Sequence, residues 1–178
     1  MAMSISIPGG ERKDYKRVLL AVDADNLHIN RPCGTRINYA ALVAFARKLG
    51  NDCLSFFYAA SARPARSACL VHTARQQGYT RAECRACRNL PNGKHKSDVD
   101  VKIAVDVLIA CSMARFDIFV LASGDGDFLP LLDFVASQGT DIYVIGPDHA
   151  SSTVLRNKWC GYLPVSAVPG LALPWAKA

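Results

Sequence analysis

Several features that define other protein classes are missing from this sequence. No apolar run approaches the ~20 residues that a membrane-spanning helix needs, and residues 1–10 lack the basic start and apolar core of a signal peptide. There is no internal repeat and no low-complexity segment. The seven cysteines are odd in number and lack the spacing of a disulfide framework, which predicts free thiols. We therefore expect a cytoplasmic globular protein that is not bound to a membrane.

What is present is typical of one globular domain. The chain has 178 residues, of which 51% are hydrophobic and 20% are charged, enough for a substantial core. We expect a flexible N-terminal tail at residues 1–15, a domain at 16–166 and a C-terminal tail at 167–178. The net charge is +6, from 21 basic and 15 acidic residues, and fits a polyanionic partner without requiring one.

Apolar segments of two lengths alternate along the chain. Short runs predict strands at residues 17–23, 53–59, 117–122 and 140–146, with more polar edge strands at 79–86 and 162–165. Helices are expected at residues 38–49, 64–78, 97–113, 129–138 and 151–158. This alternation predicts a doubly wound α/β fold, with a mainly parallel sheet of five or six strands in an order near 3-2-1-4-5.

The most informative stretch is residues 123–128, which read SGDGDF. It follows a predicted buried strand, so Asp125 and Asp127 stand at the carboxyl end of that strand, where open α/β sheets bind ligands. We expect Gly124 and Gly126 to let the backbone turn sharply there. Two carboxylates in such a place indicate a functional site.

A second acidic cluster ends the first predicted strand. Asp23 closes an apolar run, so we expect its carboxylate to face the same crevice, while Asp25 is interpreted as a helix cap. Asn26 has two interpretations: its side chain bonds its own backbone, or it orients Asp23 and an attacking water.

A further carboxylate is expected from the helix at 97–113. Its predicted apolar stripe consists of Ile103, Ala104, Val107, Leu108 and Cys111. At 100° per residue Asp100 falls within this stripe, whereas Asp98 and Asp106 are weaker candidates. Asp100 either completes a capping box with Ser97 or faces the sheet, where it needs a cation.

If the strands that end at residues 23 and 122 are neighbours, Asp23, Asp100, Asp125 and Asp127 converge. Carboxylates this close raise one another's pKa, and a hard divalent cation with oxygen ligands removes the repulsion. Mg²⁺ or Mn²⁺ suits such a set best.

These motifs resemble those of NYN domains, the PIN-like domains of the LabA/DUF88 group. The resemblance covers residues 17–165 and rests on three segments, VDADN at 22–26, VDVKIAVD at 99–106 and SGDGDFLPL at 123–131. It implies a PIN-like sheet and, as in several members, metal-dependent ribonuclease activity. Ala24 departs from the glycine usual in the family, which changes only the tightness of the turn.

A phosphatase of the haloacid-dehalogenase type is a rival interpretation. Asp23 and Asp25 imitate its nucleophile motif, and Gly124 with Asp125 imitates its late acidic motif. The chain is short, shows no cap domain and has Leu27 and Leu129 near positions where that family needs other residues.

The segment from residue 81 to residue 96 contains two further candidate sites, a cysteine pair and a group of basic residues. Cys84 and Cys87 form a single CxxC pair, which is a weak zinc signal and fits free thiols better. Basic residues in the same region predict either an ordinary solvated surface or a nucleic-acid-binding rail, and the candidates for the rail are Arg85, Arg88, Lys94 and Lys96.

The sequence therefore predicts a metal-dependent endoribonuclease that acts on RNA. Asp23, Asp100, Asp125 and Asp127 would hold Mg²⁺ or Mn²⁺, with Asn26 and Ser123 orienting the water or the ligands. The alternative is a non-catalytic RNA-binding or regulatory module with the same fold. A homodimer is left open.

Overall fold

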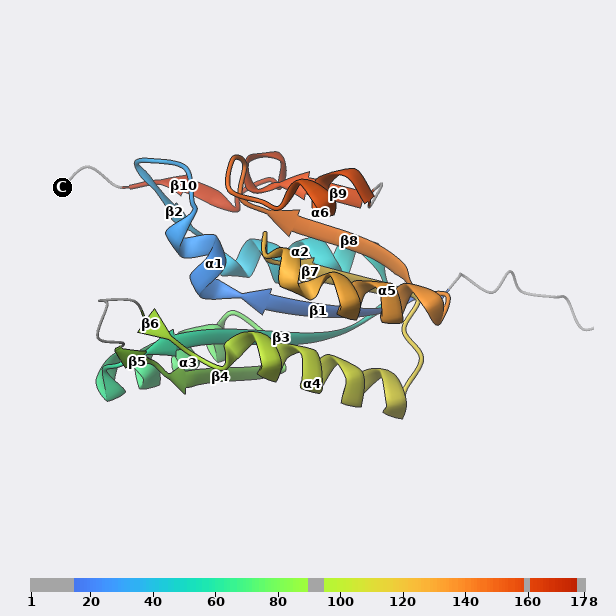
Figure 1. The fold of residues 1–178 in the computed structure, drawn as a ribbon, viewed down its shortest axis with the longest axis horizontal. Helices are drawn as coiled ribbons and strands as arrows, with labels where there is room; N and C mark the ends of the chain where they lie inside the picture. Colours follow the sequence, from blue (N-terminus) through green and yellow to red (C-terminus); the bar gives the residue numbers. More distant parts are fainter. Residues whose placement is uncertain (1–14, 90–94, 159–160, 176–178) are drawn as a thin grey trace, which may run out of the picture.

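The structure is a computed structural model that describes residues 15–89, 95–158 and 161–175. Its centre is a six-stranded sheet in the order β4-β3-β1-β7-β8-β9, and every neighbouring pair is parallel (Figure 1). The strands are β1 (Arg17–Asp23), β3 (Asp52–Ser61), β4 (Arg81–Ala86), β7 (Ile118–Ala122), β8 (Asp141–Gly146) and β9 (Gly161–Pro164). The predicted α/β fold and strand order are confirmed, and β9 adds a sixth strand at the edge.

The apolar sequence of β1 explains its central place. Its side chains from Val18 to Val22 are 0% exposed, because alternate residues enter two separate cores on opposite faces of the sheet. Val22 pairs with Ala122 of β7 and Asp23 pairs with Tyr58 of β3. The residues that follow β1 and β7 therefore emerge side by side at the carboxyl edge of the sheet.

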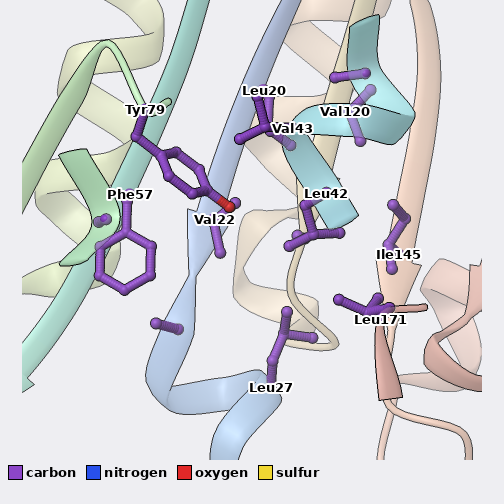
Figure 2. Close-up of a cluster of buried hydrophobic side chains, with 14 of the residues drawn as sticks. Leu20, Val22, Leu27, Leu42, Val43, Phe57, Tyr79, Val120, Ile145 and Leu171 are labelled. Atoms are coloured by element: carbon purple, nitrogen blue, oxygen red, sulfur yellow. The ribbon is translucent and has the colours of Figure 1, made fainter. Parts of the chain in front are cut away.

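Helices cover both faces of this sheet. The helices α2 (Tyr39–Leu49) and α3 (Pro64–Gln76) pack on one face, where Leu20, Val22 and Phe57 form the core shown in Figure 2. The helices α4 (Val99–Met113), α5 (Leu129–Ser137) and α6 (Thr153–Lys158) pack on the other face, over Leu19, Ala21 and Phe119. In the described part of the chain, no helix is long and apolar enough to cross a membrane.

The segment after β9 differs from the predicted C-terminal tail. A 3₁₀ turn, η2 (Val165–Ala167), is followed by β10 (Ala172–Pro174), which pairs antiparallel with β2 (Thr35–Ile37). Leu171 is buried in the core that α2 covers (Figure 2). Val168 is buried in the same core. Residues 167–175 are thus part of the domain, because these apolar side chains are removed from water there.

Two short elements near the carboxyl edge were also not predicted. Helix α1 (Ala24–Ile29) starts directly after β1. A small antiparallel hairpin of β5 (Arg88–Asn89) and β6 (His95–Lys96) precedes α4. Both lie at the end of the sheet to which the strand arrows point (Figure 1).

Candidate functional site

Asp23 is held between two segments at the end of β1. It is 4% exposed, and as the N-cap of α1 its Oδ1 accepts a hydrogen bond from the Asn26 backbone N–H at 3.1 Å. Asp25 is therefore not the cap that we expected, since the chain turns into the helix one residue earlier. The Asp25 carboxylate instead accepts from the backbone N–H of Ala60, near the end of β3.

Ser123 joins Asp23 to the loop that follows β7. Its Oγ is fully buried, donates to Asp23 Oδ2 at 3.2 Å and accepts from the Asp125 backbone N–H at 3.2 Å. Asn26 makes a parallel link, because its Oδ1 accepts from the backbone N–H of Gly124 at 2.9 Å. Neither interpretation of Asn26 anticipated this role, in which its side chain locks α1 to the loop after β7.

Asp125 and Asp127 differ in their surroundings. Asp125 caps a 3₁₀ turn, η1 (Gly126–Phe128), and its Oδ1 accepts from the Asp127 backbone N–H at 3.0 Å. Asp127 itself is exposed. One of the two carboxylates is thus held by the local fold, while the other is exposed to solvent.

The glycines of this loop serve a different purpose from the one predicted. Neither Gly124 nor Gly126 has a positive φ, so the turn itself does not require them. A Cβ on Gly124 would lie 2.7 Å from Pro147 Cδ and 2.7 Å from Ser151 Oγ, and one on Gly126 would lie 2.9 Å from Ser152 Oγ. The glycines are needed because the segment at 147–152 packs directly against the loop.

Asp100 does not face the core as predicted. The buried stripe of α4 runs through Val99, Ile103, Asp106, Val107 and Ala110, so it is rotated from the expected one and Asp100 is exposed. A capping box with Ser97 is also absent, since the N-cap is Asp98 and it makes no side-chain capping bond. Asp100 nevertheless stands with Asp127 at a groove of about 710 Å³ between α4 and α5.

The carboxylates of this edge act on one another electrostatically. Burial raises the pKa of Asp23 to about 7, and the charges of Asp100 and Asp25 add to the effect against the hydrogen bond from Asn26. The pKa of Asp100 is also raised, by partial shielding from water and then by the charges of Asp125, Asp127 and Asp25. Ionising the whole cluster therefore costs free energy in the metal-free protein.

The oxygen donors at this edge suit a hard cation such as Mg²⁺ or Mn²⁺. No Lys or Arg of the described residues forms an ion pair with Asp23, Asp100, Asp125 or Asp127. As these side chains stand, however, no three His, Cys, Asp or Glu groups within 15–89, 95–158 and 161–175 are placed to share one ion. The donor chemistry fits, and the exposed carboxylates of Asp100 and Asp127 would have to turn inward.

Comparison with known proteins decides the family. The model of the NYN domain matches residues 17–164. The chain belongs to the NYN domain family. The crystal structure of a protein of unknown function from Vibrio parahaemolyticus superposes with a TM-score of 0.73 at 19% identity, covering 88% of this chain and 96% of that one. Among curated proteins no relative matches.

NYN domains are generally nuclease-like, so the family supports a hydrolase of nucleic acid at a coarse level. The family match leaves the phosphatase interpretation without support. The LabA/DUF88 subgroup stays a prediction, as does each role assigned to an individual aspartate.

The four residues of the predicted nucleic-acid-binding rail differ in how they are placed and paired. The Arg85 guanidinium is already paired, donating to both carboxylate oxygens of Asp98 and to Glu83. Arg88 and Lys96 are backbone partners across the β5–β6 hairpin, and Lys94 lies outside the described residues. Cys84 and Cys87 are free thiols.

One acid that sequence analysis ranked low is buried. Asp106 is 4% exposed and accepts hydrogen bonds from Tyr58 Oη and Lys102 Nζ, with Arg81 3.3 Å away. Burial alone would raise its pKa, but these partners outweigh burial and lower it. The sequence contained only one sign of this pairing, which is Lys102 one helical turn before Asp106. The other two partners, Tyr58 on β3 and Arg81 on β4, are far from Asp106 along the chain.

Proposed function

We propose that this NYN domain is a metal-dependent endoribonuclease. The observation that carries the proposal is Asp23, a buried carboxylate tied through Ser123 to Asp125 and surrounded by further carboxylates without a paired cation. Structural carboxylates that are this buried are normally paired with a cation, as Asp106 is in the same molecule. The unpaired cluster supports a role in binding a cation and a phosphate.

In this proposal Asp23, Asp100, Asp125 and Asp127 hold Mg²⁺ or Mn²⁺. The bound metal would supply a water of lowered pKa and would offset negative charge on the attacked phosphate. Ser123 fixes the distance between Asp23 and the Asp125 backbone, and Asn26 fixes α1 against Gly124. The chain needs no side-chain nucleophile for this reaction.

The test is cleavage of a circular single-stranded RNA, because a circle has no ends and is cut by an endonuclease alone. We expect linear product with Mn²⁺ or Mg²⁺, none with EDTA and little with Asp125→Asn. Asp141→Asn is the control, because Asp141 is an exposed acid that begins β8 at the opposite edge of the sheet. Activity in EDTA, or in Asp125→Asn at the wild-type level, would contradict the proposed site.

The second candidate is a non-catalytic RNA-binding module. It is favoured by the absence of a ready-made three-ligand arrangement among the described residues. This module would bind the RNA circle and leave it intact at every metal concentration.

We also propose that the domain forms a homodimer through α4. The exposed residues from Val101 to Met113 are all uncharged, and Val101, Val105, Ile109 and Met113 are 66%, 44%, 51% and 81% exposed. In an antiparallel pair of α4 helices, Val101 would meet the partner's Met113 and Val105 would meet the partner's Ile109. A second copy fits this face better than RNA does, because the face offers no cation to a phosphate.

A further inference from the structure

The described surface carries a cationic cluster that the predicted rail did not include. Its members are His28 on α1, Arg31 just after α1 and Arg66 in the first turn of α3. We infer that this cluster, named here the α1–α3 cation cluster, binds backbone phosphates of an RNA whose scissile bond lies at the acidic site. The inference rests on the proposed function and adds the direction from which RNA reaches the site.

Backbone geometry puts the cluster beside the aspartates. Asp25 reaches from α1 to the backbone N–H of Ala60, and β3 ends one residue later, at Ser61. Helix α3 begins at Pro64, so its first turn stands next to Asp25, and Arg66 is exposed there. A phosphate at Arg66 would therefore adjoin the carboxylate cluster.

The second arginine is held in place by backbone acceptors. Arg31 Nε donates to the carbonyl of Thr35 at 2.7 Å, and its Nη1 donates to the carbonyl of His28. Carbonyl oxygens fix the guanidinium but leave its full positive charge, unlike the carboxylates that pair with Arg85. Within the described ranges, no carboxylate forms an ion pair with Arg31 or Arg66.

The charges of this cluster are close enough to act on one another. Partial burial, and then the charges of Arg31 and Arg66, lower the pKa of His28, while Asp25 opposes them. Arg66 also lowers the pKa of Asp25, yet burial keeps that pKa raised overall. The first turn of α3 adds to the positive potential, because it contains no acid and its N-cap, Arg63, has no side-chain capping bond.

An extended RNA suits this arrangement better than a small anion does. Exposed arginines hold one phosphate weakly, whereas a chain that is also fixed at the acidic site brings its next phosphates to Arg66 and Arg31 without a separate binding event. The cluster would therefore position RNA and would take no part in the chemistry.

The test measures binding without cleavage. A fluorescein-labelled single-stranded RNA is titrated in EDTA over a series of KCl concentrations, with fluorescence anisotropy as the readout. Arg66→Ala should weaken binding several-fold and flatten the slope of log affinity against log salt by roughly 0.7, the loss of one phosphate contact. Arg75→Ala is the matched control, because Arg75 is an exposed arginine in the last turn of the same helix.

Each outcome decides the inference. If the wild type binds RNA and Arg66→Ala has the same slope of log affinity against log salt, the α1–α3 cation cluster does not bind the RNA. That result would contradict this inference but not the proposed nuclease activity. Equal losses in Arg66→Ala and Arg75→Ala would also overturn it, since they would show attraction by net charge alone. A changed melting temperature with an unchanged slope would mean that Arg66 only offsets Asp25. If the wild type binds no RNA in EDTA, the cluster does not hold RNA by itself and this inference fails, whereas the proposed function is decided separately by cleavage of the RNA circle with Mn²⁺ or Mg²⁺.

Discussion

The ionisation of Asp23 should lower the stability of the metal-free protein, and Asp23→Asn should remove that cost. The folded-state pKa of about 7 lies above the ordinary value of 3.8, so the folded protein binds a proton more tightly than the unfolded chain does. The penalty is absent well below pH 3.8, grows as the pH rises and is complete above about pH 7. A shift of this size corresponds to about 4 kcal/mol, at about 1.4 kcal/mol for each pKa unit.

The substitution is nearly isosteric at this position. An asparagine Oδ1 still accepts from the Asn26 backbone N–H, while its amide replaces the oxygen that now accepts from Ser123. Because the variant does not titrate, the difference in unfolding free energy between variant and wild type should grow by about 2.5 kcal/mol between about pH 5 and about pH 8. Comparing the two pH values cancels any constant effect of the amide.

The assay is urea denaturation in EDTA at both pH values, followed by circular dichroism. Asp141→Asn is the control, since this exposed acid lies at the other edge of the sheet. A difference that is the same at both pH values would refute the reasoning, because it would show that the fold compensates the charge of Asp23. Saturating Mn²⁺ at pH 8 should stabilise the wild type and should stabilise Asp23→Asn less.

Four other changes test separate parts of the structure. Asp125→Asn should weaken Mn²⁺ binding in calorimetry without loss of stability in EDTA, whereas a lower melting temperature in EDTA would make Asp125 structural. Asp106→Asn, by contrast, should destabilise the fold at pH 8 by about 3 kcal/mol, because it leaves Lys102 and Arg81 without their buried partner. An unchanged free energy of unfolding in urea would show that these ion pairs do not stabilise the fold. Gly124→Ala should lower the free energy of unfolding by about 1–3 kcal/mol in the same assay, since a Cβ would lie 2.7 Å from Pro147 Cδ. A variant as stable as the wild type would show that the 147–152 segment can move away without loss of stability. Ile109→Lys should shift sedimentation from dimer to monomer, with the exposed Val154→Lys on α6 as control, and an unchanged mass would exclude α4 as the interface.

Sequence analysis located the strands and the two strand-end clusters because each rests on a short-range signal. The run of apolar residues in β1 is buried on both faces, so its end, and hence the place of Asp23, is marked in the sequence. The strand order followed from the alternation of elements and the handedness of their connections. The family resemblance then agreed with the fold, which the NYN match confirms.

The errors share a physical origin in contacts between distant segments. Helix α4 is apolar on almost every side, so periodicity could not show which stripe faces the sheet, and the buried acid of this helix is Asp106 and not Asp100. The need for Gly124 comes from Pro147 and Ser151, which lie more than twenty residues away. The pairing of β10 with β2 joins the two ends of the domain, and a three-residue strand carries no pattern of its own.

The two buried aspartates of this domain show how the site differs from the rest of the fold. Asp106 and Asp23 are equally buried, at 4% exposure each, but Asp106 has two cations and a tyrosine hydroxyl around it. Within the described part of the chain, Asp23 has backbone and serine donors, and the charged groups that shift its pKa are the carboxylates of Asp100 and Asp25. The fold can thus neutralise a buried carboxylate, yet it does not do so at the edge where β1 and β7 end. Under the proposed function, the free energy that this arrangement costs in the metal-free protein would be recovered on binding of a cation, because removal of the repulsion would add to the binding free energy. That coupling would make the stability of the NYN domain depend on metal and on pH at this one edge of the sheet.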